Sequence, residues 1–237
     1  MNRRRAALGL AVALGACGLP APARAQQRSD AEIGERIRFI EQRLELGTAA
    51  ANRWWLSWYS IYGGLTLGQA AIAFGVSDQG LRIDMAVGAF TTSLGSLTLG
   101  LFPFEARFAA ARVRALPEGD AAQRRAKLAE AEAVFRATAE DEAFGRSWAS
   151  HLIGNGVALA SGIVLGVGYD RPASGILQFA AGVTLTELQI LTQPTRALED
   201  WNRYAHQGPT PPEEEEGGDA ELWVLPEPGG LGLVGRF

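Results

Sequence analysis

The chain has 237 residues, of which 47% are hydrophobic and 20% charged, and its formal net charge at pH 7 is −4. Its single cysteine, Cys17, excludes a disulfide within one chain, and with only two histidines a zinc site of cysteine and histidine is excluded as well. The acidic balance argues against nucleic-acid binding, which requires a basic face. Because no nucleophile-base pair or metal cluster stands out, we expect neither an enzyme nor a cofactor.

Residues 1–25 have the features of an export signal peptide. Three arginines, Arg3–Arg5, precede an apolar stretch, Ala6–Leu14, that is too short to span a bilayer, and Ala23–Ala25 provides a small-residue cleavage site. Cleavage there removes four arginines and no acid, which lowers the formal net charge from −4 to −8. A second cut before Cys17, at a sequence that resembles a lipobox, would instead leave a lipid-bearing cysteine.

Residues 26–110 form the first of two predicted repeats. It begins with an amphipathic helix over 30–54, with Asp30 as its N-cap and apolar residues at helical spacing. These apolar residues are Ile33, Ile37, Ile40 and Leu44. Two uncharged stretches, about 56–76 and 85–104, follow as predicted helices, and Pro103 ends the second.

Residues 111–204 form the second predicted repeat, with the same order. After a turn at 116–120, an amphipathic helix over 121–144 has an apolar stripe of Leu128, Ala131, Phe135 and Ala139. Two apolar stretches follow at about 148–169 and 173–192, joined by the short turn 170–172 and closed by Pro194.

A shift of about 91 residues aligns the two repeats, which predicts an internal duplication. The shift places Gly63 on Gly154, Ile72 on Ile163, Gly75 on Gly166, Leu94 on Leu185 and Pro103 on Pro194.

The four apolar stretches each have about 20 residues, the length that an α-helix needs to cross a bilayer. The predicted fold is therefore all-α, with four transmembrane helices as two tandem hairpins, each preceded by an amphipathic helix. Small residues allow close helix contact in lipid, so Gly64, Gly68, Gly162 and Gly166 are candidate packing positions. Aromatic residues at one end of the first and third stretches are typical of an interfacial belt, although a buried aromatic core is the alternative. They are Trp54, Trp55, Trp58, Tyr59, Tyr62 and Trp148.

Two other folds compete with this prediction. Alternating segments such as 183–186 and the terminal Phe237 resemble outer-membrane barrels, but about half of the mature chain is rich in Ala, Glu and Arg and favours helix. The second competitor is a soluble periplasmic helical bundle whose apolar helices are buried. Two predictors of membrane orientation disagree. The signal peptide places residues 105–146 outside the inner membrane, whereas their many arginines favour the inside.

Three polar residues in the second pair of apolar stretches are candidates for a site. His151 and Asn155 lie one turn apart, and an antiparallel hairpin would bring Glu187 to a similar depth, near 20 Å from the connecting turn. An ionisable residue within a span indicates a functional role by default. The hypotheses are a proton or ion pathway, and a glutamate that fastens the two helices together.

Residues 205–237 are expected to be a disordered, acidic tail rich in Pro and Gly, with an apolar end. Trp223, Leu225 and Phe237 are candidates for docking on the body or on a partner. Gly230–Gly235 matches a dinucleotide-binding pattern, but only two residues follow it, too few for the helix that such a site needs.

The Thr-Gln-Pro-Thr motif at Thr192–Thr195, placed after paired apolar helices, resembles signal-bearing helical membrane proteins of Gram-negative bacteria over about 54–204. That resemblance implies no activity. We therefore expect a non-enzymatic integral protein of the cell envelope, in the inner or alternatively the outer membrane. Its expected partners are lipid and a protein partner or a second copy of the chain, and no nucleic acid. A small oligomeric transporter or channel subunit is the alternative.

Overall fold

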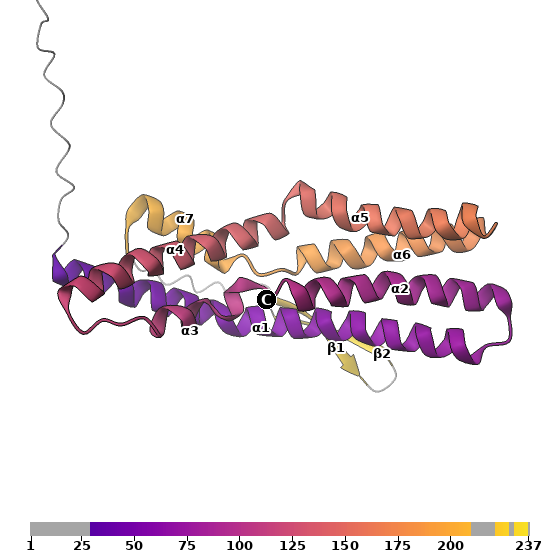
Figure 1. The fold of residues 1–237 in the computed structure, drawn as a ribbon, viewed down its shortest axis with the longest axis horizontal. Helices are drawn as coiled ribbons and strands as arrows, with labels where there is room; N and C mark the ends of the chain where they lie inside the picture. Colours follow the sequence, from indigo (N-terminus) through magenta and orange to yellow (C-terminus); the bar gives the residue numbers. More distant parts are fainter. Residues whose placement is uncertain (1–28, 210–220, 228–229, 237) are drawn as a thin grey trace, which may run out of the picture.

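The structure is a computed structural model that describes residues 29–209 and the strands 221–227 and 230–236. The described body is helical, which confirms the all-α prediction, and it is elongated, with α1 running along most of its length (Figure 1). The helices are α1 (Asp30–Gly75), α2 (Gln79–Leu101), α3 (Ala109–Arg114), α4 (Ala121–Gly145), α5 (Trp148–Ile163), α6 (Pro172–Leu191) and α7 (Arg196–Gln207), with a 3₁₀ turn η1 (Glu105–Arg107) and a π-helical end of α5, η2 (Val164–Gly168).

The first predicted amphipathic helix and the first apolar stretch form one continuous helix, α1, of 46 residues. No proline interrupts this sequence, so the hydrogen-bond ladder continues through the change from charged to apolar residues. Ser29, and not Asp30, caps the helix, because its side chain accepts a hydrogen bond from the backbone N–H of Glu32. α1 therefore belongs to both ends of the molecule.

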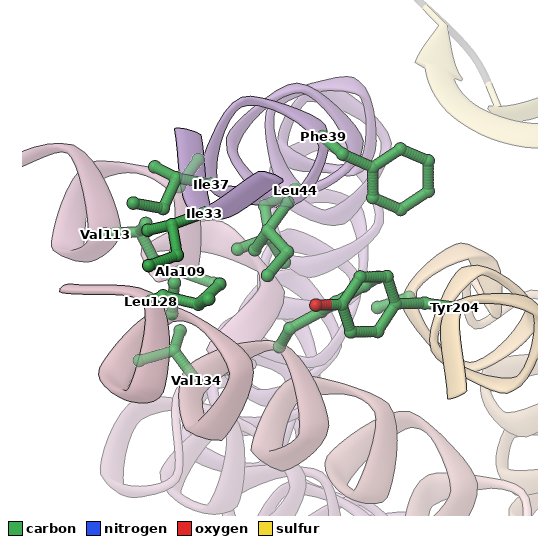
Figure 2. Packing of buried hydrophobic residues seen from close by; sticks show 14 residues of the cluster. Ile33, Ile37, Phe39, Leu44, Ala109, Val113, Leu128, Val134 and Tyr204 are labelled. Carbon is green, nitrogen blue, oxygen red and sulfur yellow. The ribbon is translucent and has the colours of Figure 1, made fainter. Parts of the chain in front are cut away.

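One end, which we call the charged half, consists of residues 30–55, 105–147 and 193–207 and has an ordinary hydrophobic core. Ile33, Ile37, Ile40 and Leu44 of α1 are buried against α3, α4 and α7 (Figure 2). The stripe predicted for α4, Leu128, Ala131, Phe135 and Ala139, is buried as well. Each large aliphatic side chain in this core contributes about 1.5–3 kcal/mol relative to exposure. Both amphipathic predictions are confirmed.

The other end, the apolar half, consists of residues 56–104 and 148–192 and contains two antiparallel hairpins (Figure 1). α1 pairs with α2, and α5 pairs with α6. Their bounds agree with the four predicted stretches to within a few residues, except that α2 begins at Gln79, before position 85. This end therefore has the predicted helical hairpins, whereas their place in a membrane and their origin by duplication stay predictions.

Small residues bring α5 and α6 close together. A Cβ added to Gly162 would lie 2.8 Å from the carbonyl oxygen of Gly175, and one added to Gly175 would lie 2.8 Å from the backbone nitrogen of Gly166. Gly162 and Gly166 therefore lie at a helix contact, as expected. Gly64 and Gly68 do not, because no described residue approaches within 4 Å of a Cβ built on either of them.

The two hairpins differ in how they join the charged half. α1 passes through without a break, whereas α4 ends at Gly145 and α5 restarts at Trp148 after an extended Ser147. α7 follows α6 through the turn at 192–195. The sequence analysis did not identify α3 or α7 as separate helices, and α7 extends beyond the predicted boundary at 204.

The disorder predicted for the tail is wrong for two segments. Glu221–Glu227 (β1) and Gly230–Arg236 (β2) form an antiparallel hairpin. Residues 210–220, which contain the acidic run, lie outside the described residues, as do the predicted signal peptide 1–25, Cys17 and Phe237. The side chains of Trp223 and Leu225 are not described either.

Candidate functional site

The apolar half exposes large hydrophobic side chains over its length. Among the described residues, all exposed large hydrophobic side chains lie in this half except those of Leu46, Phe108 and Phe144. Phe74 is 92% exposed, Val167 80% and Leu67 73%. Monomeric soluble proteins rarely show an apolar surface of this extent, and such surfaces mark membrane or protein contacts.

Among the described residues, one helix is long and apolar enough by itself to cross a membrane. This is Trp148–Gly168, formed by α5 and η2, with 21 residues and a mean hydropathy of 1.5. The other three helices of the apolar half are diluted by glycine, serine, threonine and glutamine.

Many of the diluting hydroxyl groups are hydrogen-bonded within their own helix. Thr91 donates to the carbonyl oxygen of Val87, Thr98 to that of Leu94 and Thr184 to that of Ala180, at 2.8–2.9 Å. A hydroxyl bonded in this way needs no water, so it adds little cost in an apolar medium.

Charged residues of the apolar half gather at the tips of the hairpins, with one exception. Asp78, Arg82 and Asp84 lie at the first tip, and Asp170 and Arg171 at the second. Arg171 joins the two tips, because its Nε and Nη2 donate to the two carboxylate oxygens of Asp84 at 2.8 and 2.7 Å. Ser174 donates to the same carboxylate at 2.9 Å.

The exception is Glu187, which the structure brings together with His151 and Asn155 as the predicted spacing requires. His151 Nδ1 lies 2.9 Å from Glu187 Oε2, and Asn155 Nδ2 donates to Glu187 Oε1 at 2.8 Å. The His151 and Glu187 side chains are 36% and 32% exposed. Glu187 lies about 22 Å from Pro172 by helix rise, and therefore about one turn from the end of α6. The cluster thus lies near the charged half and not midway along the hairpin.

Aromatic side chains of α1 join the two hairpins at the base of the apolar half. Trp58 Nε1 donates to Thr192 Oγ1 at 3.0 Å, and the Tyr62 hydroxyl donates to Gln189 Oε1 at 2.8 Å. Both aromatic residues are buried, whereas Tyr59 is 41% and Trp148 76% exposed. Of these aromatic residues, Trp58 and Tyr62 therefore join the two hairpins, whereas Tyr59 and Trp148 lie on the surface.

The turn at 192–195 connects the two halves. Gln193 is buried and donates from Nε2 to the carbonyl oxygen of Glu142, while Arg146 donates to the carbonyl oxygens of Leu191 and Gln193. A Cβ on Gly145 would collide with the Gln193 side chain. The glycine at the end of α4 thus makes room for the turn.

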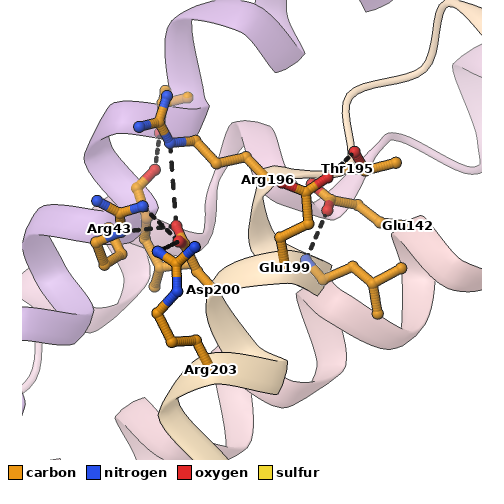
Figure 3. Close-up of polar contacts among 10 residues, drawn as sticks. Arg43, Glu142, Thr195, Arg196, Glu199, Asp200 and Arg203 are labelled. Atoms are coloured by element: carbon orange, nitrogen blue, oxygen red, sulfur yellow. Dashed lines mark hydrogen bonds and ion pairs between the residues drawn. The ribbon is translucent and has the colours of Figure 1, made fainter. Parts of the chain in front are cut away.

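α7 is held on the charged half by buried acids (Figure 3). Asp200, 3% exposed, forms a bidentate pair with Arg43 and lies 3.9 and 4.0 Å from guanidinium nitrogens of Arg196 and Arg203. Glu142 accepts a hydrogen bond from the Leu198 N–H at 2.8 Å, in the first turn of α7. Burial raises the pKa of Glu142 to about 8 even though backbone N–H groups of α7 oppose the shift.

Sequence reasoning missed the Asp84–Arg171 pair and the acids that hold α7. The predicted repeat contained a signal for the first, since two hairpins of equal length place their tips side by side. Asp200 and Glu142 carried no signal, because the contacts that attach α7, Arg43 to Asp200 and Leu198 to Glu142, join residues far apart in the sequence. In the part of the chain that the structure describes, no group of three or more His, Cys, Asp or Glu residues is arranged to hold a metal ion.

No protein-family model, curated protein or solved structure matches this chain, so its function has to be inferred from the residues and contacts described above.

Proposed function

We propose that this chain is a non-enzymatic integral membrane protein of the cell envelope, exported by its signal peptide, whose apolar half lies in lipid as four helices. Its charged half and C-terminal segment then serve as a structural or partner-binding part outside the bilayer. The observation that carries the proposal is the concentration of exposed apolar side chains on one half of an elongated molecule.

The placement of charge supports the proposal. Between the tip residues and the charged half, Glu187 is the one Asp, Glu, Lys or Arg of the described hairpins, and it is paired. α5 and η2 together have a length of about 30 Å by helix rise, which matches the hydrocarbon thickness of a bilayer. The tip charges and the charged half would then lie on opposite sides of the membrane.

Cysteine accessibility tests this arrangement on a single helix. The chain has one cysteine, Cys17, inside the predicted signal, so cleavage after Ala25 leaves a cysteine-free background. Leu46→Cys and Leu67→Cys both lie on α1, at positions that are 47% and 73% exposed in the described structure. In membranes opened on both sides, we expect a charged, membrane-impermeant maleimide to modify the cysteine at 46 and spare the one at 67.

Denaturation must make both cysteines reactive, which controls for the amount of protein. If the cysteine at 67 reacts as fast as the one at 46 before denaturation, or if alkaline carbonate releases the wild-type protein, the apolar half does not lie in lipid and the proposal is wrong. Separation of inner and outer membranes assigns the compartment in the same preparation.

An ion pathway in an oligomer is the second candidate, favoured by the contact of His151, Asn155 and Glu187. Four helices enclose little space, so this role requires several copies of the chain. Glu187→Gln should then abolish a pH-dependent ion flux in proteoliposomes, with Gln178→Glu as a control that adds an acid elsewhere on α6. If wild-type and Glu187→Gln proteins show the same flux, the cluster serves to join α5 and α6.

A further inference from the structure

Arg107 lies at the boundary between the two halves, on the face of an aromatic ring. Its guanidinium carbon is 3.7 Å from the ring centroid of Trp55 and 4.9 Å from that of Phe108. Nε donates to Asn52 Oδ1 at 2.9 Å. The stacking and this bond fix the plane of the guanidinium group, because Arg pairs with a ring face through both cation–π attraction and planar contact.

This guanidinium has no carboxylate partner among the described residues. The neighbouring acid, Glu105, pairs instead with Arg112 at 3.0 Å. Partial burial lowers the pKa of Arg107, and no acid among the described residues offsets that effect. A guanidinium that is not paired with a carboxylate can form charge-assisted hydrogen bonds with an anion at this position.

The aromatic surroundings of Arg107 are partly exposed. Trp55 stacks on Tyr59 at a centroid distance of 4.9 Å, one turn farther into the apolar half. Tyr59 is 41% and Phe108 44% exposed. Aromatic rings beside an arginine at the end of an apolar helix pair are typical of the level at which lipid headgroups meet the hydrocarbon.

We infer that Arg107, Trp55, Tyr59 and Phe108 form a binding site for the phosphodiester group of an anionic membrane lipid. The guanidinium nitrogens not bonded to Asn52 would donate to phosphate oxygens, and the aromatic side chains would contact the upper part of the acyl chains. This inference rests on the proposed membrane location. It adds that the boundary of the two halves lies at the level of the lipid headgroups. The apolar surroundings favour a lipid over free phosphate, which would leave the rings in water.

Native mass spectrometry of the detergent-purified protein, loaded with equal amounts of phosphatidylglycerol and phosphatidylcholine, tests the site. Both lipids carry a phosphodiester, but the cationic choline of phosphatidylcholine opposes the guanidinium, so we expect the wild type to retain phosphatidylglycerol preferentially. Arg107→Gln should lower that retention about fivefold, the factor for one basic side chain at an anionic surface. Arg112→Gln removes the same charge five residues away and should retain lipid as the wild type does. Arg107→Lys keeps the charge without the planar group and should give an intermediate value.

Three outcomes would overturn the inference. These are equal retention by Arg107→Gln and the wild type, an equal loss in Arg112→Gln, and displacement of the lipid by excess inorganic phosphate, which would indicate a free-anion site. Circular dichroism identifies a variant that does not fold, in which case Arg107→Lys decides. Carbonate extraction of the wild type separates the two proposals, because a carbonate-resistant protein that retains lipid without Arg107 refutes the lipid site alone.

Discussion

Buried charged residues of the charged half each have a specific partner. Lys127 is 4% exposed and pairs with Glu41 and Glu118, both at 2.8 Å, and Asp200 pairs with Arg43. Glu142 differs because no described cation pairs with it, and it accepts hydrogen bonds from the backbone at the start of α7. With a pKa of about 8, its carboxyl group is mostly protonated at neutral pH.

The raised pKa of Glu142 predicts a pH-dependent stability. Its folded pKa lies above the ordinary value of 4.5, so its contribution is complete below that value and is lost as pH rises through about 8. We expect the melting temperature of the detergent-solubilised protein, followed by circular dichroism, to fall between pH 6 and pH 9. Glu142→Gln cannot ionise and should flatten this dependence. Glu140→Gln, an exposed change on the same helix, should keep the wild-type slope, and a flat wild-type curve would contradict the prediction.

The apolar stripes of α1 and α4 could be predicted because burial there follows the helical period within one segment. Glu142 could not, since in the sequence it is one of several acids on a charged helix, and what distinguishes it is the distant start of α7. The cluster of His151, Asn155 and Glu187 is intermediate in how far the sequence predicts it. Their contact could be predicted because a short turn and two helices of known rise fix which residues face each other.

Helix boundaries depend on contacts that local sequence does not show. α1 continues through Gly47 and Thr48, whereas α4 ends at Gly145, although both lie where an amphipathic helix approaches an apolar one. The difference is the turn at 192–195, whose buried Gln193 fits against Gly145 and binds the carbonyl oxygen of Glu142. The end of α4 is thus determined by a turn about fifty residues later in the chain.

Alanine substitutions at two helical glycines test this explanation. Gly47→Ala should raise stability by up to about 1 kcal/mol, because alanine favours helix and no described atom lies within 4 Å of the new Cβ. Gly145→Ala should instead lower it by about 1–3 kcal/mol, because the Cβ displaces the buried Gln193. Chemical denaturation in mild detergent measures both.

A double-mutant cycle identifies the cause of the Gly145 effect. In a Gln193→Ala background, the side chain that collides with the new Cβ is absent, so Gly145→Ala should cost little or become stabilising. The same loss with and without Gln193 would show that the turn does not determine where α4 ends.

At the scale of the whole molecule, two hairpins with little polar contact along their middle are fastened at both ends. The base contacts are Trp58 with Thr192 and Tyr62 with Gln189, and the tip contact is Arg171 with Asp84. If the hairpins lie in lipid as proposed, no hydrophobic force drives the two helix pairs together, and packing and such specific polar contacts must hold the arrangement. The division into a charged and an apolar half could be predicted from composition. The contact between the hairpin tips could be seen only in the structure.

The tip pair predicts how the hairpins respond to one lost charge. Spin labels at two exposed tip positions, Ser77→Cys and Tyr169→Cys, report the distance between the hairpins in lipid nanodiscs. We expect a narrow distance distribution for the otherwise wild-type protein and a broader, longer one for Arg171→Gln, because the carboxylate of Asp84 then lacks its bidentate partner.

Asp84→Arg combined with Arg171→Asp restores opposite charges and should narrow the distribution again, although Ser174 no longer faces a carboxylate on α2. Arg82→Gln, at the same tip but bonded to the carbonyl oxygen of Val76, is the control and should leave the distribution unchanged. Should Arg171→Gln give the wild-type distribution, packing and the base contacts alone hold the hairpins together, and the ion pair merely accompanies an arrangement that they determine.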